Sequence, residues 1–262
     1  MSDIKVSVFG PCNRPHLWEY FYENLAMNTV DFEIVFVGNV RPNFKLPDNF
    51  KFIYANVNPV QCEFIAELNC SGEILLQTPD DAHYSPFCLD MMYETYKKEN
   101  DYKCMVAPMK FGAVINSVDN AEDILDIVNA APNQEGNKDS MFQNIQLCVG
   151  NTVSKKFWAE LGGPDKRFVF GQALTDVILR GVKAGGRIVF CPDTYFLERK
   201  DLCDANWLNA HGILYTPAGH QLMMYEWVEN GKVKDHRSDA VQPFEINDTL
   251  LTVSQGPKGE WD

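Results

Sequence analysis

Short, almost unbroken apolar runs alternate with helix-like segments in the first third of this sequence, and that alternation constrains the fold more than any other feature. The runs that read as buried strands are residues 4–10, 32–38, 50–55 and 73–78. Residues 16–27 have apolar side chains at helical spacing, and a second helix is bounded by Asn58-Pro59 and Ser71-Gly72. Strands that are apolar on both faces are typical of a mainly parallel sheet covered by helices on both sides. We therefore expect an α/β fold.

The same pattern continues to about residue 200. Further strands are expected at residues 102–109, 111–116, 145–151 and 187–192. Further helices are expected at residues 85–100, 120–131, 154–163 and 171–186, the last with about four turns. The polar stretch 132–144 is expected to be a mobile loop.

Beyond Arg199 the pattern weakens, although a hairpin is predicted around Asn230-Gly231. We therefore expect a main domain over residues 1–200. A C-terminal extension over residues 201–262 would pack on it, on the acceptor side or as a contact in an oligomer.

Composition narrows the class of protein. With 262 residues, 45% of them hydrophobic and 23% charged, the chain can bury a substantial core. No apolar run is long enough to cross a bilayer and the start does not read as a signal peptide, so we expect a cytoplasmic protein. The eight cysteines are dispersed, which favours core positions over disulfides. The net charge of -13 argues against a nucleic-acid partner.

Asp80 and Asp81 follow the run at 73–78 almost directly. Two adjacent like charges at the end of a buried strand repel each other, so a positive charge or water must lie next to them. In open parallel sheets, ligands bind beyond the carboxyl ends of the strands. Residues 11–14 and Asn39 follow the first two strands and should reach the same edge. The sequence therefore predicts one crevice built from three segments.

Five segments, in this order, resemble the GT-A fold of family 2-like glycosyltransferases: VSVFGPCNRP, EIVFVGN, GEILLQTPDDAHYSP, LGGPDKRF and DVILRGVKAGGRIVF. The resemblance covers roughly the first three quarters of the chain. In this family an acidic motif follows a strand that opens on Gly-Glu and precedes a helix that opens on Pro. Gly72-Glu73 and Pro86 stand at those places here, so the resemblance puts Asp80 and Asp81 in the motif.

The resemblance implies sugar transfer from a nucleotide-diphosphate donor to an acceptor hydroxyl, with a divalent cation that neutralises the departing diphosphate. It implies that Asp81 ligates Mn²⁺ or Mg²⁺ and that Asp80 supports the ribose or the water shell of the metal. Pro79 departs from the family, because many relatives have a first acid there. His83 is a second candidate metal ligand. Its alternative role is that of a loop histidine that covers the next helix.

For the nucleotide, the resemblance implies that Pro11 and Cys12 line the base and ribose pocket, with Arg14 near the phosphates or at the base of the loop. Asn39 stands where relatives often have an acid that accepts a bond from uracil. An amide oxygen can accept the same bond, so a UDP-sugar is favoured. Alternatively, Asn39 only supplies a turn conformation.

The expected catalytic base is the largest departure from the family. Inverting relatives carry an acid pair at the start of the helix predicted at 171–186, whereas this chain has Ala173 and Leu174 there. Asp176 is the best single candidate for the base. Acids from other segments are alternatives: Glu135, Asp139, Asp165 and Asp204. A retaining enzyme would need no such base, and a protein that no longer catalyses would need none either.

The leading hypothesis is a metal-dependent glycosyltransferase that acts on a saccharide or another hydroxyl-bearing acceptor, which the sequence does not identify. The missing acid pair leaves open a noncatalytic protein that binds nucleotide sugars or acts as a scaffold on the same fold. A nucleotidyltransferase is a third class with similar sheet architecture. The absence of a glycine-rich, basic first loop argues against it.

Overall fold

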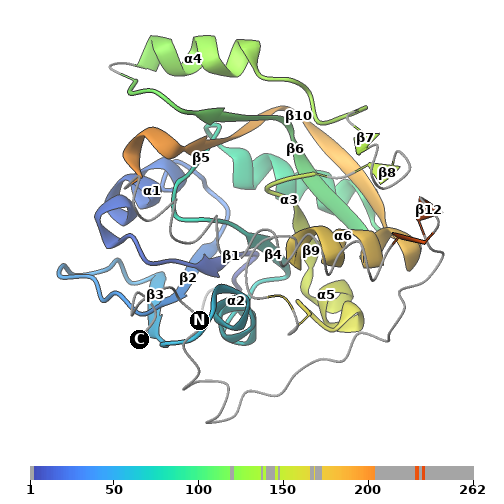
Figure 1. Cartoon of the computed structure of the whole chain (residues 1–262), viewed down its shortest axis with the longest axis horizontal. Helices are drawn as coiled ribbons and strands as arrows, with labels where there is room; N and C mark the ends of the chain where they lie inside the picture. The colour runs from blue at the N-terminus through green and yellow to red at the C-terminus, as the bar shows by residue number, and fades with distance from the viewer. Residues whose placement is uncertain are drawn as a thin grey trace.

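The central element is one sheet of eight strands (Figure 1). The computed structural model describes residues 3–118, 121–136, 138–139, 145–146, 148–165, 168, 173–203, 228–229 and 232–233. The strands of the sheet are β1 (Val6–Pro11), β2 (Phe32–Gly38), β3 (Phe50–Tyr54), β4 (Ile74–Gln77), β5 (Ala82–Tyr84), β6 (Cys104–Val114), β9 (Thr152–Ser154) and β10 (Arg187–Arg199). Their order across the sheet is β3-β2-β1-β4-β9-β6-β10-β5.

Most neighbours in this sheet are parallel. β3, β2, β1 and β4 form a parallel half, and β6 runs parallel to β10. β9 lies antiparallel between β4 and β6, and β5 pairs antiparallel with β10 at the far edge. The prediction of a mainly parallel α/β sheet is therefore confirmed. Because β1, β2 and β4 are parallel, the segments that follow them emerge at one edge of the sheet.

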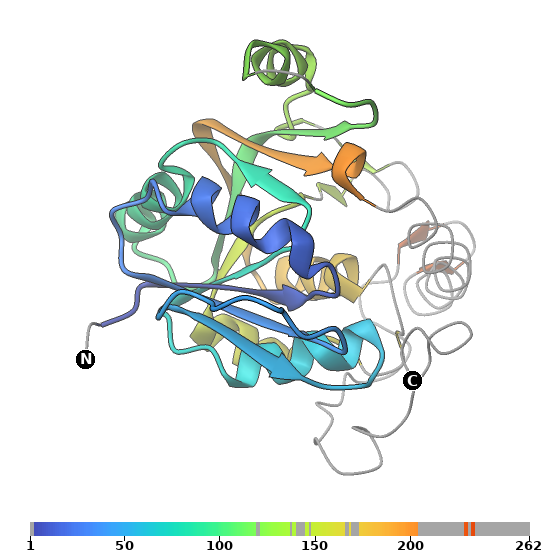
Figure 2. The ribbon, with the colours of Figure 1, turned by 90° about the vertical axis from the view of Figure 1, so that its left-hand side faces the viewer.

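Helices cover both faces of the sheet, as the apolar strands require (Figure 2). They are α1 (Trp18–Leu25), α2 (Pro59–Leu68), α3 (Cys88–Glu99), α4 (Ala121–Ala130), α5 (Lys155–Leu161) and α6 (Ala173–Lys183). One core lies under α1 and α3, and a second lies under α2, α5 and α6. α4 lies apart from both, against β6 at the top of Figure 1. Within the described residues, no helix is long and apolar enough to span a membrane.

Pairing between distant segments extends several strands beyond their predicted ends. β6 is one strand, where two separate runs were predicted, because β10 pairs with it from Arg187 opposite Cys104 to Arg199 opposite Val114. Between Cys191 and Tyr195 the register of β10 against β6 shifts at an irregularity, and pairing then resumes with Tyr195 opposite Lys110. β5 was not predicted at all. Its three residues are a strand because β10 pairs with them.

Other boundaries also differ from the predictions or lie outside the described residues. α6 has 11 residues, about three turns rather than four. β7 (Lys138–Asp139) lies within the predicted loop and pairs with β8 (Ile145–Gln146), at the start of the strand predicted at 145–151. The strand that joins the main sheet is β9, just after that predicted run. The C-terminal hairpin is confirmed, since β11 (Val228–Glu229) pairs antiparallel with β12 (Lys232–Val233). Most of residues 201–262 lie outside the described part, so the domain boundary at residue 200 stays a prediction.

Two glycines allow the segments at the carboxyl edge to approach closely. A Cβ atom on Gly10 in β1 would lie 2.0 Å from the carbonyl oxygen of Thr78, just after β4. One on Gly38, at the end of β2, would lie 2.1 Å from the side chain of Asn13. Real Cβ contacts are never this short, so both positions exclude any side chain. The backbones after β1, β2 and β4 therefore lie in direct contact.

We predict that Gly10→Ala destabilises the protein by about 3 kcal/mol, because the clash is with backbone that cannot rotate away. Gly112→Ala is the matched control, since its Cβ would meet the mobile end of Leu197 at 3.1 Å. We expect a loss of no more than about 1 kcal/mol there. Urea unfolding of both variants measures the difference. Equal losses would contradict the close approach of β1 and β4.

Candidate functional site at the carboxyl edge of the sheet

Asp80 is a buried carboxylate with hydrogen-bond donors on both oxygens. It lies between β4 and β5 and is 1% exposed. The Arg14 Nε donates to Oδ1 at 2.6 Å, and Arg14 Nη2 forms an ion pair with the same oxygen. The backbone N–H of Arg14 at 2.9 Å and Trp18 Nε1 at 3.1 Å both donate to Oδ2. Asp80 thus ties the segment after β1 to the segment after β4.

Asp81 is equally buried but unevenly satisfied. Its Oδ2 receives Lys200 Nζ at 2.9 Å, Arg14 Nη1 at 3.2 Å and the Cys203 thiol at 3.2 Å. Its Oδ1 is buried and has no hydrogen-bond partner among the described residues. Burial alone raises the pKa of Asp81, but the charges of Arg14 and then Lys200 outweigh burial and leave the pKa below its ordinary value. Asp81 is therefore ionised at neutral pH.

Lys200 was missed by the sequence analysis, as was Cys203. Both follow the C-terminal end of β10, far from Asp81 in the chain, and Lys200 begins a short 3₁₀ helix, η2 (Lys200–Leu202). The only sequence signal is a basic pair, Arg199-Lys200, after a weak strand pattern. Such pairs are common on surfaces. Lys200 reaches the site because β10 extends to Arg199, whose backbone N–H donates to the Asp81 carbonyl oxygen at 2.7 Å.

His83 lies in an aromatic stack next to this cluster. Its ring stacks on Tyr20 at 5.7 Å and on Tyr195 at 6.0 Å between centroids. Its Nδ1 lies 2.8 Å from the Tyr20 hydroxyl, which also accepts a bond from Arg199 at 2.5 Å. The Tyr20 hydroxyl can accept from Arg199 and still either donate to Nδ1 or accept from it, so this contact engages Nδ1 in both tautomers of His83. Burial and then the charge of Arg199 lower the pKa of His83 to about 4, so the ring is neutral.

These contacts decide whether the residues fit the divalent cation that the resemblance implies. Asp80 has donors on both oxygens, and Nδ1 of His83 is engaged by the Tyr20 hydroxyl. Only one oxygen of Asp81 remains. The described residues contain no group of three His, Cys, Asp or Glu side chains that could hold a metal.

The positive charges next to Asp81 are a stronger argument against a bound divalent cation than the small number of free ligand atoms. Asp80 and Asp81 are already balanced by two positive charges, those of Arg14 and Lys200. At an effective dielectric constant of about 20, a +2 and a +1 charge about 5 Å apart repel by about 7 kcal/mol. For an ion on the remaining oxygen of Asp81, such repulsion from both side chains offsets the attraction of the two carboxylates, so these four groups offer it no net negative charge. In this arrangement the residues do not fit Mn²⁺ or Mg²⁺.

The residues predicted to bind the nucleotide lie beside this cluster. Pro11 is the last residue of β1 and pairs with Val37 of β2, and the buried Cys12 donates its backbone N–H to the Val37 carbonyl at 2.8 Å. The backbone N–H of Asn39 donates to the side chain of Asn13 at 2.9 Å. The structure thus brings the segments after β1 and β2 together with the carboxylates, and the nucleotide-binding role of these residues stays a prediction.

Asp176 lies elsewhere, in a buried ion pair within α6. It is fully buried and accepts a bond from Arg180 Nε at 2.9 Å. Arg180 also donates to the carbonyl oxygens of Leu161 and Gly163, at the end of α5. The pair therefore fastens α6 to α5, and the role of Asp176 as catalytic base stays a prediction. Among the alternative bases, Glu135 is exposed and Asp165 is buried, whereas the side chains of Asp139 and Asp204 lie outside the described residues.

No protein-family model matches the sequence, and no curated protein shows detectable sequence similarity to it. Solved structures do match its fold. TarS 1-349 from S. aureus shares 14% identity over 74% of this chain and 60% of its own, with a TM-score of 0.54. The mannosyltransferase PcManGT from Pyrobaculum calidifontis, solved with GDP-Man and Mn²⁺, shares 15% identity over 83% of this chain and 63% of its own, with a TM-score of 0.55.

TarS 1-349 has also been solved with UDP-GlcNAc, and this complex matches at 14% identity over 74% of our chain and 59% of its own, with a TM-score of 0.52. The chain thus spans about 60% of the length of these solved chains. At such identity the similarity shows the fold alone. The chain therefore has the GT-A fold that the resemblance in sequence predicted.

Proposed function

We propose that the chain is a glycosyltransferase that moves a hexosyl or pentosyl group from a nucleotide-diphosphate sugar to a hydroxyl of a saccharide or another acceptor. One observation carries the proposal: a buried pair of carboxyl side chains, Asp80 and Asp81, lies at the carboxyl edge of a GT-A sheet, next to the joined segments after β1 and β2. The GDP-Man and UDP-GlcNAc complexes of the structural neighbours support a nucleotide-sugar donor. A UDP-sugar is favoured, because Asn39 stands where an acceptor for uracil is expected.

In this reaction the acceptor oxygen attacks the anomeric carbon, and the bond from that carbon to the diphosphate breaks. Negative charge then grows on the departing diphosphate, so the largest contribution to catalysis comes from positive charge held at that point. Arg14 is positioned for this role by its four contacts with Asp80 and Asp81, which fix the guanidinium before any ligand arrives. Such preorganisation avoids the cost of reorienting a side chain during the reaction.

A second candidate function is supported by the residues of α6, where the catalytic base is expected. Ala173 and Leu174 carry no titratable group, and Asp176 is engaged by Arg180. A protein with this arrangement binds a nucleotide sugar but lacks the general base that an inverting transfer uses. The alternative is therefore a noncatalytic nucleotide-sugar-binding or scaffold protein on the same fold.

A donor panel distinguishes these functions. We predict that UDP, and more weakly GDP or dTDP, raises the melting temperature and binds in calorimetry, because the residues predicted to bind the nucleotide lie beside the carboxylates on the same edge of the sheet. Release of UDP from UDP-sugars in the presence of saccharide acceptors identifies the enzyme. Binding without hydrolysis or transfer identifies the noncatalytic protein. If none of the three nucleotides binds, both functions are wrong.

The Asp176–Arg180 pair makes a second prediction. We expect Asp176→Asn to destabilise the protein by about 3–5 kcal/mol, because it leaves the buried charge of Arg180 without its partner. Arg180→Met is the matched variant, since it breaks the same pair and keeps the Asp176 carboxylate. The free energy of unfolding, measured in urea, and the donor turnover per folded molecule should fall by similar amounts in the two variants. A loss of turnover of about 100-fold or more in Asp176→Asn alone would instead identify Asp176 as the base.

A further inference from the structure

We propose that this site works without a divalent cation, and that the ammonium of Lys200, next to the guanidinium of Arg14, binds the leaving diphosphate in its place. The inference rests on the proposed glycosyl transfer and concerns how its donor is held. It starts from the disagreement described above: the resemblance implies a metal at Asp81, but two cationic side chains already contact that carboxylate.

The two cations reach the site from distant parts of the chain and meet on one atom. Arg14 follows β1 and Lys200 follows β10, and both contact Oδ2 of Asp81, at 3.2 and 2.9 Å. Two charges brought together in this way are built into the fold. They differ from a basic surface patch, because the side chains of Arg14 and Asp81 are only 6% and 0% exposed.

Lys200 is the cation that can reach a ligand. Its side chain is 29% exposed, and it also forms an ion pair with Glu198 at 3.2 Å. Burial lowers the pKa of Lys200, but Asp81 and Glu198 outweigh burial and leave the pKa above its ordinary value, so the ammonium stays charged. An ammonium has three hydrogens, and these two carboxylates take two of them. The third hydrogen of the ammonium is directed to neither carboxylate and can be donated to a phosphate oxygen.

The unpartnered oxygen of Asp81 adds a second requirement on the ligand. A buried carboxylate oxygen without a donor is unfavourable, so a ligand that donates a hydrogen bond to it binds more tightly. Ionised carboxylates only accept hydrogen bonds, so this oxygen suits a hydroxyl and repels a phosphate. A ligand with anionic oxygens for Lys200 and Arg14 and a hydroxyl for Asp81 matches the site. A sugar or ribose next to a diphosphate has both.

The reaction balances without a metal. When water takes the place of the acceptor, its oxygen forms a bond to the anomeric carbon while the carbon–oxygen bond to the diphosphate breaks. The electron pair of that bond stays on the diphosphate oxygen, where Lys200 and Arg14 stabilise it, and the proton of the attacking water passes to solvent. The products are the free sugar, the nucleoside diphosphate and one proton.

The test is calorimetry of UDP and GDP binding to the full chain, once in EDTA and once in MnCl₂. We expect the dissociation constant of the bound nucleotide to agree within about threefold between the two conditions. Lys200→Met should weaken binding in EDTA by about 10- to 100-fold, which corresponds to the loss of one charge-assisted contact. Lys200→Arg should recover most of this loss, because it restores the charge.

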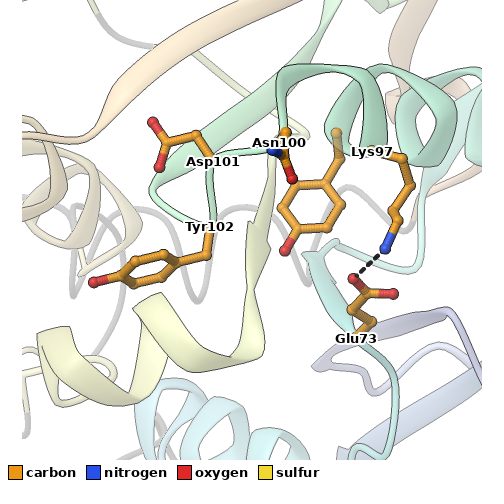
Figure 3. Close-up of a pocket in the computed structure, with 6 residues that line it drawn as sticks. Glu73, Lys97, Asn100, Asp101 and Tyr102 are labelled. Carbon is orange, nitrogen blue, oxygen red and sulfur yellow. Dashed lines mark hydrogen bonds and ion pairs between the residues drawn. The ribbon is translucent and has the colours of Figure 1, made fainter.

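The matched control is Lys97→Met. Lys97 pairs with Glu73 at 2.9 Å, the distance of the Lys200–Asp81 pair, and lies at the opposite end of β4 beside a small pocket (Figure 3). It should leave nucleotide binding unchanged. Melting curves of all variants check folding, and Lys200→Arg keeps the test valid if Lys200→Met does not fold.

The outcomes separate this inference from the proposed function. Binding that requires MnCl₂, or a Lys200→Met variant that binds as well as Lys97→Met, would overturn the metal-free site and leave a glycosyltransferase standing. If neither UDP nor GDP binds in either condition, the proposed function fails and this inference fails with it.

Discussion

The contact between the Arg14 guanidinium and the Asp80 carboxylate supports the whole carboxyl edge of this sheet. A buried ion pair stabilises a protein only when hydrogen bonds satisfy its remaining atoms, because desolvation of two charges otherwise outweighs their attraction. Here the backbone of Arg14 and the indole of Trp18 complete the carboxylate. The contact therefore locks the segment after β1, the start of α1 and the end of β4 into one unit. Gly10 allows the two backbones to come close enough for it.

The charges of the adjacent carboxylates Asp80 and Asp81 are compensated by side chains of the protein itself. Like charges at a strand end need compensation, and a metal ion, water or basic side chains can each provide it. In this fold Arg14 and Lys200 do so, and the pair is balanced before any ligand binds. β10 pairs with β5 directly after the carboxylates, and this pairing brings Lys200 to Asp81 and Arg14. The side chains that balance the carboxylates are thus in place in the fold itself.

The region predicted to hold the catalytic base has a different character. Asp176, the acid nearest to the expected base, stabilises the junction of α5 and α6 through Arg180. Its carboxylate is fully buried, and a base must contact the acceptor hydroxyl to remove its proton. The position of Asp176 in the sequence does not show which role it has, because an acid in the first turn of a helix can form an i,i+4 ion pair or act as a base. Only the orientation of Arg180 toward the end of α5 distinguishes them.

The sequence by itself determined the α/β class, the order of strands and helices over most of the chain, and the place of Asp80 and Asp81 at a strand end. These features follow from local patterns, because apolar runs, capping residues and turn signals depend only on residues that are close in the sequence. The tertiary structure decided the full length of β6 and β10, the existence of β5, and the arrival of Lys200 at Asp81. Each depends on pairing between segments far apart in the chain, which no local pattern encodes. For the same reason the sequence identified two carboxylates, and only the fold decided which charges meet them.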